Sequence, residues 1–309
     1  MHFMVTGGAG FIGSHMVYKL LRDGHFVTVI DNFSTGKAEN LPIDKNHLKI
    51  IKTDIQNSTE VFSLDGEFDG IFHLAALVSV PESIENPEKS FMTNSCGTFH
   101  MLEFARRKNV PRFIFASSAA VYGNTTMFPV EENNDLKPLS PYGLEKMHGE
   151  WLCQMYSHTY GIKTRAMRFF NVFGPRQDHF SPYSGVISIF INHLRSGKQV
   201  TIYGDGLQTR DFVFVSDVVD ALYKSMTDHR DNAYEVYNVG TGTSTAVIQL
   251  YNTICEILNL VKSPDFQQSR HGDIKHSHAN ISRIQSCLGY HPRYSLKEGL
   301  IALIQNPIM

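Results

Sequence analysis

A tyrosine and a lysine stand four residues apart in the segment SPYGLEK, residues 140–146. Ser140 and Pro141 are typical of the start of a helix, because a serine side chain accepts hydrogen bonds from free N–H groups and proline has no N–H to leave unpaired there. Side chains four residues apart share one face of a helix, so Tyr142 and Lys146 can approach each other. The pair is either an exposed helix edge or an acid–base group.

An acid–base role requires the pKa of the phenol to fall well below its ordinary value of about 10. A drop to about 7 needs roughly 4 kcal/mol of preference for the phenolate. A cation ~4 Å away supplies about that much at an effective dielectric constant of about 20. Lys146 is such a cation, and an oxidised nicotinamide ring would add a second positive charge. Taken alone, the spacing is more typical of a solvated helix edge, and only a dinucleotide-binding context would favour a tyrosine base beside a nicotinamide cofactor.

A glycine-rich segment, VTGGAGFIG, gives Gly8, Gly10 and Gly13 the G-x-G-x-x-G spacing, with Gly7 before them. It follows a β-type run and opens a helical pattern, and this context is typical of a loop that binds a pyrophosphate at a helix N-terminus. Asp31 ends the next predicted strand, 18 residues beyond Gly13. A carboxylate there would accept hydrogen bonds from both ribose hydroxyls and repel a 2′-phosphate, which favours NAD over NADP. The alternative is a glycine-rich turn with a chance acid after it.

Short β-branched and aromatic runs alternate with helical patterns from FMVT through FVTVID, LKIIKTD and GIFHLAA to RFIFASS. Such alternation predicts an α/β fold with a Rossmann-like, doubly wound parallel sheet. Parallel strands end at one edge, so Ser118, at the end of RFIFASS, should lie beside the glycine loop. Asp54, which ends IIKTD, either faces the adenine edge or caps a helix.

Two domains that exchange chain are expected. Residues 1–171 plus about 211–242 should form the NAD-binding domain. About 172–210 plus 243–309 should form a smaller C-terminal α/β domain that binds the substrate.

The composition excludes several classes of partner. The formal charge is -2, and no run of five like charges occurs, so neither nucleic acid nor an anionic membrane is an expected partner. No apolar stretch approaches the ~18 residues that span a bilayer, and the N-terminus lacks a secretory pattern, so a cytoplasmic protein is expected. Four scattered cysteines argue against disulfides, and the 15 histidines lack acidic or cysteine co-ligands at metal-binding spacing. No metal site is expected.

Six further stretches extend the pattern from Gly7 to Asp217: TGGAGFIG, HLAA, SSAAVYG, YGLEK, RFFNVFGPRQ and YGDGLQTRDFVFVSDVV. In this order they resemble the extended short-chain dehydrogenase/reductase family, a Rossmann-fold group that acts on nucleotide sugars. The resemblance implies that Tyr142 is the base, that Lys146 holds the cofactor ribose and lowers the phenol's pKa, and that Ser118 assists. The other residues that we expect to contact NAD are Gly7, Gly10, Phe11, Ile12, Gly13, Asp31, Asn32, Asp54, Ile55, Leu74, Ala75, Ala76, Asn94, Ser117 and Phe169.

Two alanines, Ala119 and Ala120, distinguish the branches of this family. The dehydratases carry Asp and Glu here, and the nucleotide-sugar decarboxylases carry a Glu at the position of Ala120. An epimerase needs no such extra acid, since one base and a retained cofactor serve both half-reactions. The resemblance therefore implies a 4-epimerase of a UDP-hexose that works through a 4-ketosugar. The alternatives are an epimerase of a uronic acid, a dehydratase, and a catalytically silent NAD-binding regulator, which is disfavoured because Tyr142, Lys146 and Ser118 are all intact.

The substrate side is implied by the same resemblance. Arg210 and Arg270 would clamp the diphosphate, although isolated loop arginines are more often solvated surface charges. Ser277 aligns with a pocket wall that is bulky in epimerases restricted to glucose and galactose, so a serine leaves room for an N-acetyl group, unless it is an ordinary loop residue. UDP-N-acetylglucosamine is thus the expected substrate, with UDP-glucose also accepted. The full set expected on this side is Ser118, Asn171, Val186, Arg210, Arg270, Asp273 and Ser277.

Family members commonly pair through the two helices beside the site, here about 90–108 and 142–160. A homodimer is therefore expected, with apolar contacts from Met101, Leu102, Phe104, Leu152, Met155 and Tyr156. The alternative is that these side chains belong to the core of a monomer.

Overall fold

The computed structural model describes residues 1–43, 46–178, 185–269 and 275–305 of the chain. They form two compact units. The first comprises Met1–Gly123, Asp135–Phe169 and Val219–Tyr237, and the second comprises Asn124–Asn134, Phe170–Val218 and Asn238–Met309. The predicted domain boundaries, and the ligand that each domain binds, stay predictions.

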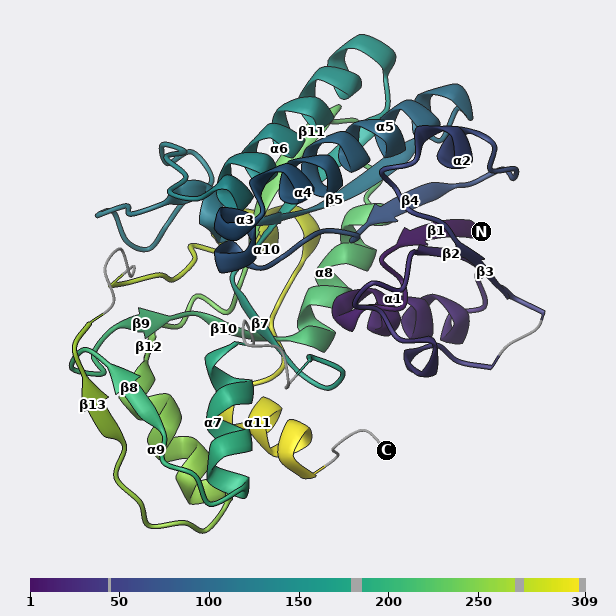
Figure 1. Ribbon diagram of the computed structural model, residues 1–309. Coiled ribbons are helices and arrows are strands. Elements are labelled where there is room, and N and C mark those ends of the chain that lie inside the picture. The colour runs from purple at the N-terminus through teal and green to yellow at the C-terminus, as the bar shows by residue number, and fades with distance from the viewer. Residues whose placement is uncertain (44–45, 179–184, 270–274, 306–309) are drawn as a thin grey trace. The chain divides into compact units, whose positions relative to one another are not determined.

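The first unit is built on a seven-stranded sheet with the strand order β11-β6-β5-β4-β1-β2-β3 (Figure 1). Every neighbouring pair from β3 to β6 is parallel, so the carboxyl ends of these strands share one edge. The Rossmann-like α/β fold that the sequence predicts is therefore confirmed. The strands are β1 (His2–Thr6), β2 (Phe26–Asp31), β3 (Leu48–Lys52), β4 (Gly70–His73), β5 (Arg112–Ser118), β6 (Lys163–Phe169) and β11 (Tyr234–Val239), the last of which crosses into the second unit.

Helices cover both faces of this sheet. Helices α1 (Phe11–Arg22) and α8 (Val215–Met226) lie on one side, and α2 (Ser58–Phe62), α5 (Gly97–Arg107) and α6 (Pro141–Tyr160) lie on the other (Figure 1). The central strands β1, β4, β5 and β6 are therefore buried on both faces, as expected of a central parallel sheet. The core beneath α5 and α6 joins side chains of both helices to β5, among them Met101, Leu102, Phe104, Phe113, Phe115, Cys153 and Tyr156.

Local sequence explains the ends of α6. The Ser140 side chain accepts a hydrogen bond from the Gly143 N–H at 3.1 Å, and Pro141 occupies the first turn, as predicted. Gly161 ends the helix in the left-handed conformation at φ 74°, which glycine adopts without steric cost. Tyr142 and Lys146 therefore lie in the first two turns of a long, firmly capped helix.

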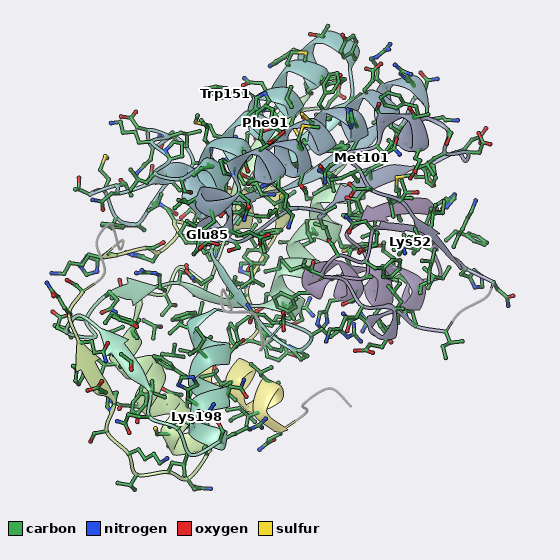
Figure 2. The ribbon with its side chains drawn as sticks, in the orientation of Figure 1. Lys52, Glu85, Phe91, Met101, Trp151 and Lys198 are labelled. Atoms are coloured by element: carbon green, nitrogen blue, oxygen red, sulfur yellow. The ribbon has the colours of Figure 1, made fainter. Side chains whose placement is uncertain are left out.

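Two stretches that look continuous in the sequence are interrupted in the structure. The run TRAMRFFNV is not one strand, because it breaks at Phe170 between β6 and β7 (Asn171–Phe173), which pairs with β10 (Phe212–Phe214) in the second unit. The helical stretch near 90–108 is three consecutive elements: α4 (Pro87–Phe91), a π-helical turn over Met92–Cys96 and α5. The short α3 (Val80–Glu85) precedes them. Figure 2 marks Phe91 on α4 and Trp151 on α6, two apolar side chains that are 50% and 55% exposed.

The second unit packs short strands against helices around its own apolar core. Three two-stranded pairs are present in its described part: β10 with β7, β12 with β9, and β13 with β8. Its remaining elements are α7 (Val186–Arg195), β8 (Thr201–Tyr203), β9 (Thr209–Arg210), β12 (Thr245–Ala246), α9 (Val247–Ile257), β13 (Asp265–Gln267), α10 (Ser282–Leu288) and α11 (Leu296–Gln305). Two 3₁₀ turns, Ala38–Asn40 and Ala119–Tyr122, belong to the first unit.

Within the ranges that the structure describes, none of the helices combines the length and the apolar character needed to cross a bilayer.

Candidate active site

The glycine turn after β1 is shaped by close packing. Gly7 has a φ of 66°, and a Cβ at this position would lie 2.7 Å from the Ala75 nitrogen. A Cβ on Gly13 would lie 2.0 Å from the Gly7 carbonyl oxygen. A Cβ on Gly10, by contrast, would meet only that oxygen, at 3.2 Å. Packing therefore requires glycine at 7 and 13, whereas Gly10 leaves room on the face where a pyrophosphate would approach the helix N-terminus.

Asp31 braces the glycine turn. Its Oδ2 accepts a hydrogen bond from the Ala9 N–H at 2.9 Å and its Oδ1 one from the Phe33 N–H at 2.8 Å. A carboxylate oxygen has two lone pairs, so each oxygen can accept one more hydrogen bond. The side chain can thus hold the turn and still accept ribose hydroxyls, as NAD binding requires.

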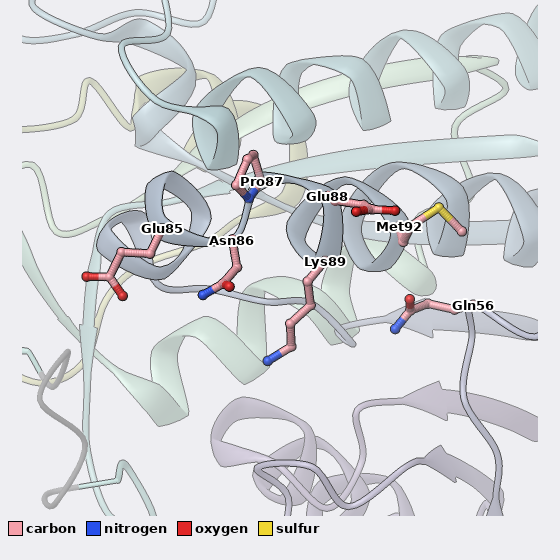
Figure 3. Close-up of a pocket in the computed structure, with 7 residues that line it drawn as sticks. All are labelled: Gln56, Glu85, Asn86, Pro87, Glu88, Lys89 and Met92. Atoms are coloured by element: carbon pink, nitrogen blue, oxygen red, sulfur yellow. The ribbon is translucent and has the colours of Figure 1, made fainter.

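Asp54 is held by its neighbours at the end of β3. Its carboxylate accepts hydrogen bonds from the Asn32 side chain at 2.8 Å and from the Gln56 N–H at 2.8 Å, while the Ile55 side chain packs into the core. A cavity of about 590 Å³ opens beside Gln56, and Figure 3 shows its lining residues, which are Gln56, Glu85, Asn86, Pro87, Glu88, Lys89 and Met92. None of them is a predicted site residue. The Gln56 N–H donates to Asp54, so the cavity adjoins the predicted adenine side, and neither Tyr142 nor Lys146 is among its lining residues.

The segment after β4, Leu74–Ala76, is fixed by β1 and by a buried histidine. The Leu74 N–H donates to the Thr6 carbonyl at 3.2 Å and the Ala75 N–H to the Thr6 hydroxyl at 3.2 Å. That hydroxyl also contacts His73 Nδ1 at 2.8 Å. Burial, together with the charge of Lys146, lowers the pKa of His73 to about 3, so its ring stays neutral.

The three predicted catalytic side chains meet at the carboxyl end of β5. Ser118 interacts with the Tyr142 hydroxyl in the sense that favours the phenolate and lowers its pKa. Lys146 Nζ donates to the Ala116 carbonyl at 2.8 Å and lies 5.7 Å from the centroid of the Tyr142 ring. Tyr142 and Lys146 are both buried. The helix edge is therefore not solvated, and the pair has the surroundings of an acid–base group rather than of a surface feature.

The expected lowering of the phenol's pKa by Lys146 is not found. Burial raises the pKa of Tyr142 to about 12, the hydrogen bond from Ser118 opposes this rise, and the charge of Glu145 adds to it. Burial lowers the pKa of Lys146 to about 8. The ammonium group is directed to the Ala116 carbonyl and not to the phenol oxygen, so the protein's own groups favour a neutral phenol.

A buried ion pair beneath Ser117 was missed from the sequence. Arg168 donates two hydrogen bonds to Glu150, from Nε to Oε1 at 2.9 Å and from Nη2 to Oε2 at 2.7 Å. The Ser117 hydroxyl also donates to Glu150. Arg168 Nη1 donates to the Tyr122 hydroxyl at 2.8 Å. Burial lowers the pKa of Arg168, but the pairing with Glu150 outweighs burial and raises it. The network holds both ends of the 3₁₀ turn that begins after Ser118. Glu150 follows Lys146 by four residues, so the two side chains share one face of α6, and this spacing is the sequence signal that could have pointed to Glu150.

Asn94 lies in the π-helical turn, and its side-chain amide forms hydrogen bonds with both the N–H and the carbonyl of Leu77. Its Oδ1 accepts the Leu77 N–H at 2.8 Å, and its Nδ2 donates to the Leu77 carbonyl at 3.0 Å and to Glu145 Oε2 at 2.6 Å. Asn94 therefore fixes the turn that follows Leu74–Ala76. Phe169 ends β6 opposite Ser118 in the sheet register. The predicted cofactor residues thus lie in one unit, at or just beyond the carboxyl edge of its sheet, and they fit NAD.

The described substrate-side residues beyond Ser118 belong to the second unit. Strand β9 carries Arg210 and pairs with β12, while on its other side the Ser277 N–H donates to the Thr209 carbonyl at 3.1 Å. The structure thus brings Arg210 and Ser277 to adjacent segments. Asn171 is exposed on β7, and Val186 begins α7. Arg270 and Asp273 lie outside the described residues.

Asp211, next to Arg210, is a buried acid that sequence reasoning missed. Its carboxylate accepts hydrogen bonds from the N–H groups of Thr241 at 2.8 Å, Gly242 at 2.9 Å and Ala279 at 3.2 Å. Burial raises its pKa, although these hydrogen bonds oppose the rise. Asp211 therefore ties the strand that carries Arg210 to the segment that follows Ser277.

A Rossmann-like sheet with a glycine turn, an acid at the end of β2 and a buried tyrosine–lysine pair is the architecture of a dinucleotide-dependent enzyme. The model of the NAD dependent epimerase/dehydratase family matches residues 3–240. The chain belongs to this family, and its cofactor is NAD.

Solved structures and a curated relative agree with this assignment. UDP-glucose 4-epimerase of Thermotoga maritima, solved with UDP-glucose, superposes with a TM-score of 0.93 at 38% identity, covering 99% of this chain and 98% of that one. UDP-N-acetylglucosamine 4-epimerase of Methanobrevibacter ruminantium, solved with UDP-N-acetylmuramic acid, gives 0.93 at 37% identity, with 98% and 97% covered. UDP-glucuronic acid decarboxylase 1 of Xenopus tropicalis is 34% identical over 304 residues, 96% of this chain and 70% of that protein.

Proposed function

We propose that the chain is an NAD-dependent UDP-sugar 4-epimerase whose preferred substrate is UDP-N-acetylglucosamine, with UDP-glucose also accepted. One observation carries the proposal: Tyr142 and Lys146 are buried one helical turn apart, with Lys146 Nζ 5.7 Å from the Tyr142 ring centroid, at the sheet edge where Ser118 ends β5 and the glycine turn follows β1. The two 4-epimerases of similar fold support the class of reaction.

Tyr142 is the proton carrier in this reaction. When bound, NAD supplies the acceptor that takes a hydride from C4 of the sugar and returns it, and its oxidised ring brings the positive charge that favours the phenolate. Tyr142 takes the proton of the C4 hydroxyl and gives it back after the 4-ketosugar has turned over. Ser118 holds the C4 oxygen by a hydrogen bond, and Lys146 contributes its charge and binds the ribose. Inversion at C4 follows because hydride returns to the opposite face.

The turn after Ser118 supports epimerisation over elimination or loss of carboxylate. Ala119 and Ala120 occupy the 3₁₀ turn at the end of β5, where neither can donate or accept a proton through its side chain. A dehydratase or a decarboxylase needs an additional acid, and this turn offers none. A uronate 4-epimerase remains the second candidate from the sequence.

The N-acetyl preference depends on Ser277. The Ser277 N–H donates a hydrogen bond to Thr209, which precedes Arg210 on β9. The proposed sugar wall and the proposed diphosphate ligand are therefore parts of one local structure. Removing a group from a roomy pocket costs less than forcing one into a full pocket, which is why UDP-glucose should also react.

Product analysis tests the proposal. Purified protein is incubated separately with UDP-N-acetylglucosamine, UDP-glucose and UDP-glucuronate, and the sugars are identified by NMR. We expect the C4 epimers of the first two, and little change in the third. A pentose product, a 4-keto-6-deoxy sugar, or conversion of UDP-glucuronate alone would contradict the proposed activity.

A further inference from the structure

Glu145, between Tyr142 and Lys146 in the sequence, is a buried acid whose role the reaction above leaves open. Its side chain faces the π-helical turn and α4, where Oε2 accepts hydrogen bonds from the Ser90 hydroxyl at 2.6 Å and from Asn94 Nδ2 at 2.6 Å. Both donors are neutral, and they are buried as deeply as the acid itself. A carboxylate removed from water and bonded to neutral partners is expensive compared with a glutamine of the same shape.

The contacts of Glu145 lead directly to the cofactor segment. Asn94 donates to Glu145 with the same amide nitrogen that donates to the Leu77 carbonyl, and its oxygen accepts the Leu77 N–H. A carboxylate can only accept hydrogen bonds, so it fixes which end of the Asn94 amide faces the catalytic helix. The orientation of that amide in turn fixes Leu77, which directly follows the predicted cofactor residues Leu74–Ala76.

We propose that Glu145 is a positioning residue that locks the Leu77 turn to the catalytic helix through Asn94, and that its charge sets the pH range in which Tyr142 and Lys146 work together. The second part rests on the proposed 4-epimerase function, whereas the first concerns cofactor retention alone.

Glu145 stands three residues after Tyr142 and directly before Lys146 on α6, and all three side chains are buried, so its charge acts on both groups at short range and in the same direction. Burial is the largest cause of the high pKa of Tyr142, and the negative charge of Glu145 raises that pKa further. Burial lowers the pKa of Lys146, and Glu145 opposes this fall, so the ammonium ion survives at a higher pH than it otherwise would. The same carboxylate therefore impedes ionisation of the phenol while preserving the lysine's charge.

The titratable groups nearest this trio are neutral or paired, while Glu85 on α3 and Glu88 on α4 are acids at exposed positions. Burial raises the pKa of the Cys153 thiol well above its usual value and lowers that of His73 to about 3. Glu150 is paired with Arg168. On α3 and α4, the surface pair Glu82 and Lys89 neutralise each other at 2.8 Å. Removing the charge of Glu145 should therefore be felt by Tyr142 and Lys146 without compensation from these neighbours.

Two substitutions separate the charge from the hydrogen bonds. Glu145→Gln removes the charge and keeps an acceptor oxygen for Ser90 and Asn94, whereas Glu145→Ala removes both. Glu88→Gln, on the exposed side of α4, is the matched control. Each protein is tested for its content of NAD after gel filtration, for the rate at which NAD is released, for its unfolding temperature, and for its epimerase rate from pH 5 to 10.

Glu145→Gln should retain NAD and shift both limbs of the pH–rate profile to lower pH, on the order of one unit for the loss of one nearby charge. The acid limb moves because the phenol loses its proton more easily, and the alkaline limb moves because Lys146 loses its charge earlier. Glu145→Ala should in addition release NAD on the order of tenfold faster, since Asn94 loses its anchor. Glu88→Gln should match the wild type throughout.

The outcomes distinguish this role from a structural one. A lower unfolding temperature with a lower rate at every pH and unmoved limbs would show that Glu145 only supports the fold, and would overturn its effect on the pH range. Release of NAD at the wild-type rate from Glu145→Ala would overturn the positioning role. If the wild type has no epimerase activity, the proposed function fails, while the NAD-release experiment still decides whether Glu145 holds the cofactor segment. If Glu145→Ala does not fold, Glu145→Gln decides the charge effect alone.

Discussion

At the residue scale, the phenol of Tyr142 sits in a site that opposes its ionisation. Its pKa is raised to about 12 by burial, and the lysine that was expected to lower it points to a backbone carbonyl. Since the nearby charge of Lys146 does not offset burial, the phenol should ionise readily only when a further positive charge lies beside it. Proton removal should therefore be coupled to the presence of oxidised cofactor, which protects the enzyme from acting before NAD is in place.

Tyr142→Phe should reduce the epimerisation rate by at least about 1,000-fold, because the proton carrier is lost while the ring and its packing remain. NAD should stay bound, since Lys146 and the glycine turn are unchanged. The rate is measured by NMR and the cofactor by its absorbance after gel filtration. Tyr160→Phe, on the exposed end of the same helix, serves as the control and should behave like the wild type. Near-normal turnover by the Tyr142 variant would disprove the assignment of the base.

Ser277→Tyr should restrict the substrate range. A phenol ring in place of the hydroxymethyl group would fill the space proposed for the N-acetyl group, so activity on UDP-N-acetylglucosamine should fall at least tenfold more than activity on UDP-glucose. The ratio of kcat/KM for the two substrates measures this. Ser286→Tyr, on the exposed side of α10, is the control. An equal loss on both substrates would refute Ser277 as the pocket wall.

Sequence reasoning predicted the trio of Tyr142, Lys146 and Ser118, which the structure brings together, because local spacing carries its signal. Tyr142 and Lys146 are one helical turn apart, and Ser118 ends a strand whose direction follows from the βαβ pattern. Glu145 and Asp211 could not be found this way. Asn94, which donates to Glu145, is 51 residues from it in the sequence, and Thr241, which donates to Asp211, is 30 residues from it. Only the tertiary fold therefore shows that these two buried carboxylates are hydrogen-bonded.

At the element scale, the predicted strands and helices of the sheet were confirmed, while two interruptions were not foreseen. The hydrophobic pattern does not reveal the break at Phe170, because Phe169 and Phe170 are followed by Val172 and Phe173, so strand-type residues continue from β6 in the first unit into β7 in the second. The π-helical turn before α5 adds a residue to one turn of an otherwise regular helix, and helical periodicity barely changes across it. That turn nevertheless places Asn94 against Leu77 and Glu145.

The contact between α6 and β6 depends on the buried pair of Glu150 and Arg168. Glu150→Gln leaves the guanidinium buried without its partner charge, which should lower the free energy of unfolding by about 3–5 kcal/mol. Urea unfolding followed by circular dichroism measures the change. Asp135→Asn breaks an exposed pair with Lys137 and should leave the unfolding curve close to that of the wild type. Similar curves for all three proteins would mean that the buried pair contributes nothing to stability.

At the scale of the whole molecule, the expected dimer surface needs a correction. Met101, Leu102 and Phe104 are fully buried, and Tyr156 is nearly so, because they face the core beneath α5 and α6. The large apolar side chains that α3, α4, α5 and α6 leave exposed are Val80, Ile84, Phe91, Phe99, Leu144, Trp151, Met155 and Tyr160. A cavity of about 390 Å³ lies among them, lined by Phe91, Ser95, Cys96, Phe99, His100, His148 and Leu152. Clustered exposed apolar residues of this kind mark association surfaces.

We expect this face to bury itself against the same face of a second copy, because a two-fold axis brings identical patches together and would bury about 1,600 Å² if the interface is of ordinary size. Combining Phe91→Glu with Trp151→Glu places two charges in each copy where the partner would remove water from them, and should convert the dimer to a monomer. Sedimentation velocity at several protein concentrations measures the mass. Ile50→Glu, on the exposed edge strand β3, is the control and should leave a dimer. A monomeric wild type, or a double variant that still sediments as a dimer, would rule out this face as the interface. If the monomeric double variant keeps its bound NAD, each copy holds its cofactor without the partner.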